Sequence, residues 1–156
     1  MYLTRPKARR SEPLELGGIP LDTLDRFLPT ALLVVSFGLL CWGLLGLVEY
    51  VFPALNLGLQ DSNFPAGLQF IHFFALVLTG SIFVIGYLTR WRHTPHATIT
   101  MYAVLAVICF IETIDFGAFG GGAPGVIIML MEFALYAVLS TYLVTSGALH
   151  HRFGRA

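Results

Sequence analysis

The sequence predicts an all-α integral membrane protein, an antiparallel four-helix bundle with a short N-terminal interfacial helix. Of the 156 residues, 56% are hydrophobic and only 12% are charged, and the mean hydropathy is +0.78. A soluble domain carries about twice that share of charge. Four long apolar segments with short polar connections account for the excess. This composition excludes a nucleic-acid-binding protein, a disordered chain and an ordinary soluble domain.

Residues 1–28 are expected to form a cytoplasmic basic arm followed by the interfacial helix. Glu12 and Glu15 make the segment too acidic for an organelle transit peptide. The apolar residues of the helix, Leu21, Leu24 and Phe27, recur at helical spacing. Anionic lipid headgroups are the expected contacts of the arm's cations, Arg5, Lys7, Arg9 and Arg10.

Four membrane spans are predicted within a domain of residues 29–148, and residues 149–156 are expected to form a cytoplasmic tail. Each span is long enough to cross about 30 Å of hydrocarbon. Proline marks three of the expected helix starts, at Pro29, Pro65 and Pro124. The predicted spans are 29–52, 65–89, 97–117 and 125–148. Because the connections are short, consecutive spans must run antiparallel.

The positive charges predict the orientation in the membrane. The nine Lys and Arg residues precede the first span, lie between the second and third, or follow the fourth. The other two connections contain none. By the positive-inside rule, both termini are expected in the cytoplasm, in a bacterial inner membrane or an organelle equivalent.

Ionisable and amide side chains inside or at the ends of the spans are the candidate ligand-, proton- or metal-binding residues. An ionisable group within the hydrocarbon is costly, so such residues point to function. Helical spacing places Gln69 beside His72, and Glu112 beside Asp115. We expect four helices to contribute to one polar cluster in the outer half of the bundle. Its members are Gln69, His72, Glu112, Asp115, Glu132 and Glu49.

Three interpretations of this cluster stay open. Each group could be satisfied by a neighbouring hydrogen bond or by the interface. The cluster could instead bind a proton, a divalent metal or a quinone head group, or it could contact the helices of a partner. Cys41 and Cys109 lie in apolar runs and are expected to be small core residues.

Haem and catalytic chemistry find little support. A bis-His haem needs two histidines at similar depth, and His72 is the only histidine well inside a span. An intrachain haem is therefore disfavoured, although one shared at a subunit interface stays open. The sequence contains neither GxSxG nor HExxH, and no catalytic residue is predicted.

The segment HFFALVLTGSIFVIGYLTRWR, residues 72–92, resembles the second span of the DoxX-like small four-span membrane proteins. The similarity lies in a glycine-broken apolar run that ends in a Leu-Thr-Arg turn, together with chain length and topology. That family often has an acidic residue where this chain has His72. The resemblance implies a place in membrane redox systems, including quinone-linked ones.

Four short-looped spans leave almost no extramembrane domain, so the first functional hypothesis is a non-catalytic accessory subunit of a larger bioenergetic or transport complex. Its expected partners are membrane lipids and either other membrane subunits or further copies of the chain, not nucleic acid. One alternative is a redox protein that binds a quinone, metal or proton through the polar cluster. Another is a small proton-coupled exporter.

Overall fold

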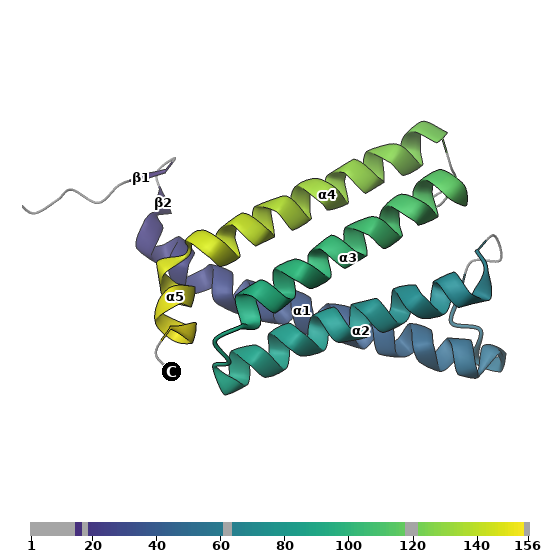
Figure 1. Cartoon of the computed structure of the whole chain (residues 1–156), viewed down its shortest axis with the longest axis horizontal. Coiled ribbons are helices and arrows are strands. Elements are labelled where there is room, and N and C mark those ends of the chain that lie inside the picture. The colour runs from purple at the N-terminus through teal and green to yellow at the C-terminus, as the bar shows by residue number, and fades with distance from the viewer. Residues whose placement is uncertain (1–14, 17–18, 61–63, 118–121, 155–156) are drawn as a thin grey trace, which may run out of the picture.

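The computed structural model describes residues 15–16, 19–60, 64–117 and 122–154, with side chains from residue 27 onward. The described residues form five α-helices, a 3₁₀ turn and a pair of two-residue strands (Figure 1). The helices are α1 (Leu21–Val51), α2 (Ala66–Thr89), α3 (Thr94–Asp115), α4 (Gly122–Thr145) and α5 (Gly147–Phe153). The turn η1 is Pro53–Leu55, and the antiparallel strands are β1 (Glu15–Leu16) and β2 (Ile19–Pro20).

Helices α1 to α4 confirm the predicted all-α membrane protein. Each contains a segment long and apolar enough to cross a bilayer, from 22 to 25 residues in length. Figure 1 places the α2–α3 turn and α5 at one end of the bundle. We call it the basic end, because Arg90, Arg92 and Arg152 belong to these segments. The other end, where α1 gives way to α2 and α3 to α4, is called the far end.

The first helix differs from the prediction. Residues 21–28 form its first two turns rather than a separate interfacial helix, and α1 runs unbroken for 31 residues. Pro29 therefore lies inside the helix and does not mark its start. An interior proline removes one backbone hydrogen bond and tends to kink a helix, but its φ is helical, and α1 continues through Pro29.

The other helix starts follow proline more closely. Pro65 is the N-cap of α2, as expected. Helix α3 begins at Thr94, three residues earlier than predicted, and α4 begins at Gly122 rather than after Pro124. Pro95 and Pro124 thus both lie in a first turn, where the backbone amide has no partner within the helix to lose.

Residues 149–153 of the predicted C-terminal tail fold back onto the bundle as part of α5. Helix α4 ends at Thr145, and Ser146 caps α5 by accepting a hydrogen bond from the Leu149 amide at 3.4 Å. Leu149 and Phe153 are buried. The Arg152 guanidinium donates to the Tyr87 carbonyl at 3.0 and 3.3 Å and lies 3.6 Å from the centre of the Tyr87 ring. These contacts hold α5 against α2.

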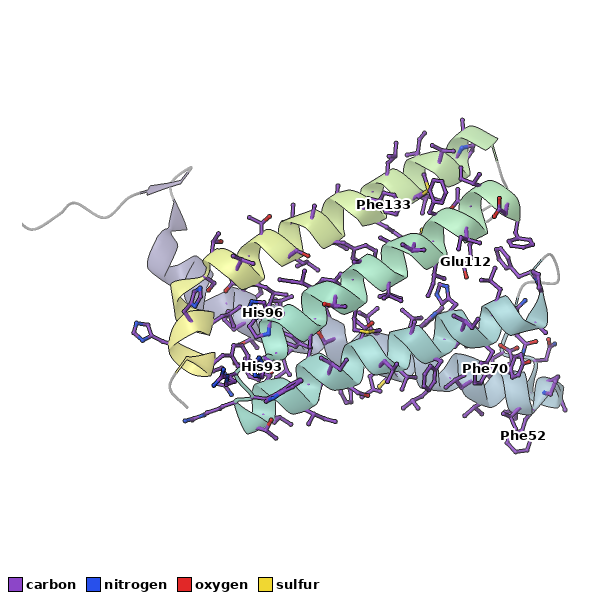
Figure 2. The ribbon with its side chains drawn as sticks, in the orientation of Figure 1. Phe52, Phe70, His93, His96, Glu112 and Phe133 are labelled. Carbon is purple, nitrogen blue, oxygen red and sulfur yellow. The ribbon has the colours of Figure 1, made fainter. Side chains whose placement is uncertain are left out.

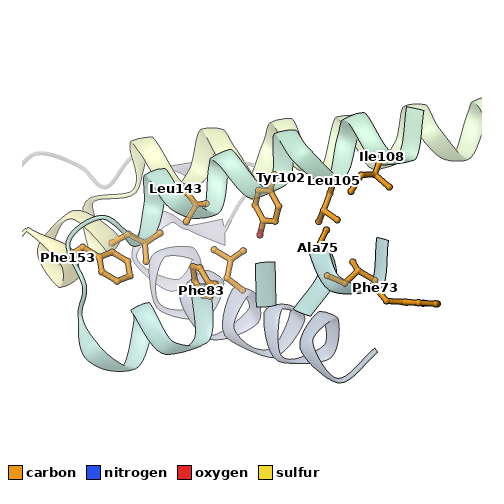
Figure 3. Close-up of a cluster of buried hydrophobic side chains, with 11 residues drawn as sticks. Phe73, Ala75, Phe83, Tyr102, Leu105, Ile108, Leu143 and Phe153 are labelled. Atoms are coloured by element: carbon orange, nitrogen blue, oxygen red, sulfur yellow. The ribbon is translucent and has the colours of Figure 1, made fainter. Parts of the chain in front are cut away.

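The helices pack in chain order, α1 on α2, α2 on α3 and α3 on α4. The α1–α2 and α3–α4 pairs diverge toward the far end (Figure 1). The apolar core lies mainly toward the basic end, where Phe83, Tyr102, Leu143 and Phe153 interdigitate (Figure 3). In a bilayer the hydrophobic effect does not drive helices together, so van der Waals packing of complementary shapes must hold such a core. The far half of the bundle is left more open.

Candidate ligand-binding site

A cavity of about 500 Å³ lies between the two helix pairs and extends toward the far end. We call it the polar cavity, because apolar walls surround four polar side chains and a tyrosine. Figure 2 shows Glu112 projecting from α3 toward α2. The lining residues are Leu39 and Trp42 of α1, Leu59 and Phe64, Gln69, His72, Phe73 and Leu76 of α2, Leu105, Cys109 and Glu112 of α3, and Glu132 and Tyr136 of α4.

His72 and Glu112 form the first polar pair of the cavity. Nδ1 of His72 lies 2.7 Å from Oε1 of Glu112, which joins α2 to α3. The glutamate side chain is 9% exposed and the histidine 31%. Because His72 lies six residues after the start of α2, it is about 9 Å along the helix from that end. The pair is therefore inside the span, where an unpaired charge would be costly.

Cys109 and Glu132 form the second pair. The Cys109 thiol donates a hydrogen bond of 2.7 Å to Oε2 of Glu132, which joins α3 to α4. Cys109 was predicted to be a small core residue, and it is buried; its thiol in addition has a carboxyl partner. Two hydrogen-bonded pairs thus bridge three consecutive helices around one cavity.

The tautomer of His72 decides whether its second ring nitrogen, Nε2, donates or accepts a hydrogen bond. In one net-neutral form Glu112 is protonated and donates to Nδ1, so the neutral imidazole carries its proton on Nε2. In the other, Glu112 is a carboxylate and the imidazolium carries a proton on each nitrogen. Net-neutral forms cost least in surroundings of low dielectric. Both net-neutral forms leave an N–H on Nε2 that can recognise a carbonyl oxygen, whereas a neutral His72 that donates from Nδ1 to the Glu112 carboxylate leaves Nε2 as an acceptor.

Two polar side chains hold the wall of the polar cavity at the far end. The Glu49 carboxylate accepts hydrogen bonds from the amides of Gly58 and Leu59 at 2.9 and 2.8 Å. The side-chain amide of Gln69 donates through Nε2 to the Phe64 carbonyl at 3.3 Å. Because Leu59 and Phe64 line the cavity, Glu49 and Gln69 position its wall. Phe64 also contacts the ring of Phe116, which follows α3.

The structure brings Gln69, His72, Glu112 and Glu132 together, but not the whole predicted cluster. Glu49 is 4% exposed and occupied by loop amides, so α1 contributes no ionisable group to the cavity. Asp115 is exposed at the end of α3 and does not line it. The prediction that four helices supply one polar cluster was therefore wrong, because the loop after α1 satisfies Glu49.

Three lining residues were missed as candidates: Cys109, Tyr136 and Trp42. Helical spacing was the available signal for two of them, since Cys109 precedes Glu112 by three residues and Tyr136 follows Glu132 by four. The Tyr136 ring stacks on buried Tyr102, with ring centres 5.4 Å apart.

Metal ligation has less support than hydrogen bonding at this site. Among the described residues, no group of three or more His, Cys, Asp or Glu side chains is placed to hold a metal ion. His93 and His96 lie at the basic end, away from Glu112 (Figure 2). The cations of the predicted arm, Arg5, Lys7, Arg9 and Arg10, lie outside the described residues.

Comparison with known proteins gives no family. No protein-family model matches the chain, and no curated protein or solved structure matches it significantly. The resemblance to DoxX-like proteins accordingly stays a prediction.

Proposed function

We propose that this small integral membrane protein binds the carbonyl-bearing head of a lipophilic molecule of the quinone class in the polar cavity. The observation that carries the proposal is the joint lining of one intramembrane cavity by the His72–Glu112 and Cys109–Glu132 pairs. Binding sites for small molecules are typically apolar cavities with a few convergent polar groups, and this cavity has that character.

Each lining group has a role in the proposed complex. Nε2 of His72 donates a hydrogen bond to a ligand carbonyl. Glu112 keeps the shared proton on the pair and fixes the ring through Nδ1. Phe73 and Trp42 offer aromatic surface to a planar ring. Glu132, hydrogen-bonded to Cys109, is a second carboxyl group able to exchange a proton with a ligand oxygen.

The chain's two tryptophans allow a direct test of binding. Trp42 lines the polar cavity, whereas Trp91 follows α2 at the basic end. In lipid nanodiscs, the Trp91→Phe protein reports on Trp42 and the Trp42→Phe protein reports on Trp91. Titration with decylubiquinone should quench Trp42 saturably and Trp91 only in proportion to the quinone dissolved in the lipid. Linear quenching of both would refute the proposal.

The role of an accessory subunit stays a prediction. Large apolar residues are exposed along α4, for example Ile127, Met131, Leu135 and Val138. Lipid chains cover such a face as well as a protein partner would, so it favours neither. The exporter hypothesis likewise gains no specific observation.

A further inference from the structure

We infer that a second, independent site, at the basic end, binds the phosphate head of an anionic phospholipid. A cavity of about 350 Å³ lies there between the α2–α3 turn, the end of α4 and α5. We call it the basic-end cavity. Its lining residues are Arg92, Pro95, His96, Ile99, Leu143, Val144, Leu149, His150, Phe153 and Gly154.

The basic-end cavity is lined by basic side chains and by no acidic one. Arg92 and His96 are exposed at its rim, and no Asp or Glu is among its lining residues. Arg152, in contrast, is engaged by the Tyr87 carbonyl and ring, so it serves to hold α5. Arg92 thus supplies a guanidinium that can form paired hydrogen bonds with phosphate oxygens.

The turn that carries Arg92 is built from specific hydrogen bonds. Thr94, which is fully buried, donates through its amide and hydroxyl to the Trp91 carbonyl at 3.0 and 2.6 Å. The amide of Trp91 donates to the Gly86 carbonyl at 2.9 Å. The backbone of Arg92 is held between these contacts, which fixes where its exposed side chain leaves the turn.

The opposite wall is apolar and fixed by α5. Nε2 of His150 donates to the Val144 carbonyl at 2.8 Å, which joins α5 to the end of α4. Half-buried Ile99 and exposed Val144 offer apolar surface beside the cationic rim. A free phosphate would use only the rim, whereas a phospholipid would use both the rim and the wall. Exposed Trp91 next to Arg92 is typical of the membrane–water interface, where such headgroups lie.

Native mass spectrometry of the full chain in mild detergent tests this inference by counting bound lipids. Phosphatidylglycerol is the anionic probe, and phosphatidylcholine is the zwitterionic control. The Arg92→Gln variant should bind one phosphatidylglycerol fewer than the unmodified chain, or bind it about tenfold more weakly. The matched control is Arg90→Gln, which removes an exposed cation from the same turn but outside the cavity.

Equal losses in the Arg92→Gln and Arg90→Gln variants would overturn the site, as would equal binding of the two lipids. Inorganic phosphate is the third probe in this experiment. If millimolar phosphate displaces the Arg92-dependent lipid, the cavity recognises free phosphate and the phospholipid assignment is wrong. Circular dichroism of both variants verifies that the helices are retained.

Discussion

Glu49 and Glu112 are both buried carboxyl groups near the far end, and they differ in what they bind. Glu49 accepts from two loop amides, whereas Glu112 is paired with an imidazole that lines a cavity. The first arrangement fixes the backbone of the loop after α1, and the second leaves Nε2 of His72 for a ligand. Because ionisable groups are costly in a membrane, the sequence identifies both residues as candidate functional residues. Only the fold separates a structural role from a binding one.

Glu49→Leu should destabilise the protein by about 2 kcal/mol, because two part-buried amides lose their acceptor. Thermal unfolding in detergent, followed by circular dichroism, measures the loss. Glu49→Gln keeps one acceptor oxygen and should lose less. Asp115→Asn changes an exposed carboxylate and serves as the control; a loss as large as that of Glu49→Leu would contradict the assignment.

Glu112→Leu should weaken decylubiquinone binding about tenfold, because His72 loses the side chain that fixes its ring through Nδ1. Saturable quenching of Trp42 in the Trp91→Phe background is the readout. Asp115→Asn in that background lies outside the cavity and should leave binding unchanged. Unaltered affinity in the Glu112→Leu protein would remove this pair from the site.

At the residue scale, the sequence singled out the cavity-lining side chains that are costly in a membrane and missed those that are not. His72, Glu112 and Glu132 are conspicuous because the hydrocarbon penalises ionisable groups. A cysteine or tyrosine costs little in a membrane, so Cys109 and Tyr136 gave no such signal. The Glu49 partners are amides of a connection whose path no periodicity predicts.

At the scale of elements, helix existence was predictable and helix ends were less so. Long apolar runs identify α1 to α4, and all four have matching helices. Proline is ambiguous, since it favours a first turn but is also tolerated within a helix that packs well. That ambiguity explains why α1 continues through Pro29 while Pro65 caps α2.

Gly80 determines how closely α1 and α2 approach. A Cβ at this position would lie 2.5 Å from the Ser36 carbonyl oxygen, a backbone atom that cannot turn away. Gly80→Ala should therefore destabilise the protein by about 1–3 kcal/mol in thermal unfolding. A Cβ on Gly38 meets nothing within 4 Å, so Gly38→Ala is the matched control. Equal stability of the two variants would contradict the close approach.

At the scale of the whole molecule, the two helix pairs are joined at the basic end and diverge at the far end. The core lies mainly in the joined half, and the polar cavity extends into the diverging half; Phe73, Leu76 and Leu105 belong to both. The sequence predicts the number and direction of the spans. It cannot predict this divergence, because tertiary packing rather than span hydrophobicity sets it.

The predicted orientation can be tested with single cysteines in a protein whose Cys41 and Cys109 are replaced by alanine. Leu57→Cys places an exposed thiol at the far end, and His151→Cys places one on α5. A membrane-impermeant maleimide should label Leu57→Cys in intact bacterial spheroplasts and His151→Cys only after permeabilisation. The reverse pattern would place both termini outside.

Native mass spectrometry of the tagged protein, released from its own membranes, tests ligand binding in the polar cavity most directly. The account predicts a chain or small oligomer that retains a lipophilic carbonyl compound. That mass should disappear in the Glu112→Leu, Glu132→Gln double variant and persist in Arg92→Gln. A chain with no cavity-dependent mass, found only within a large stoichiometric assembly, would contradict the account and favour an accessory subunit.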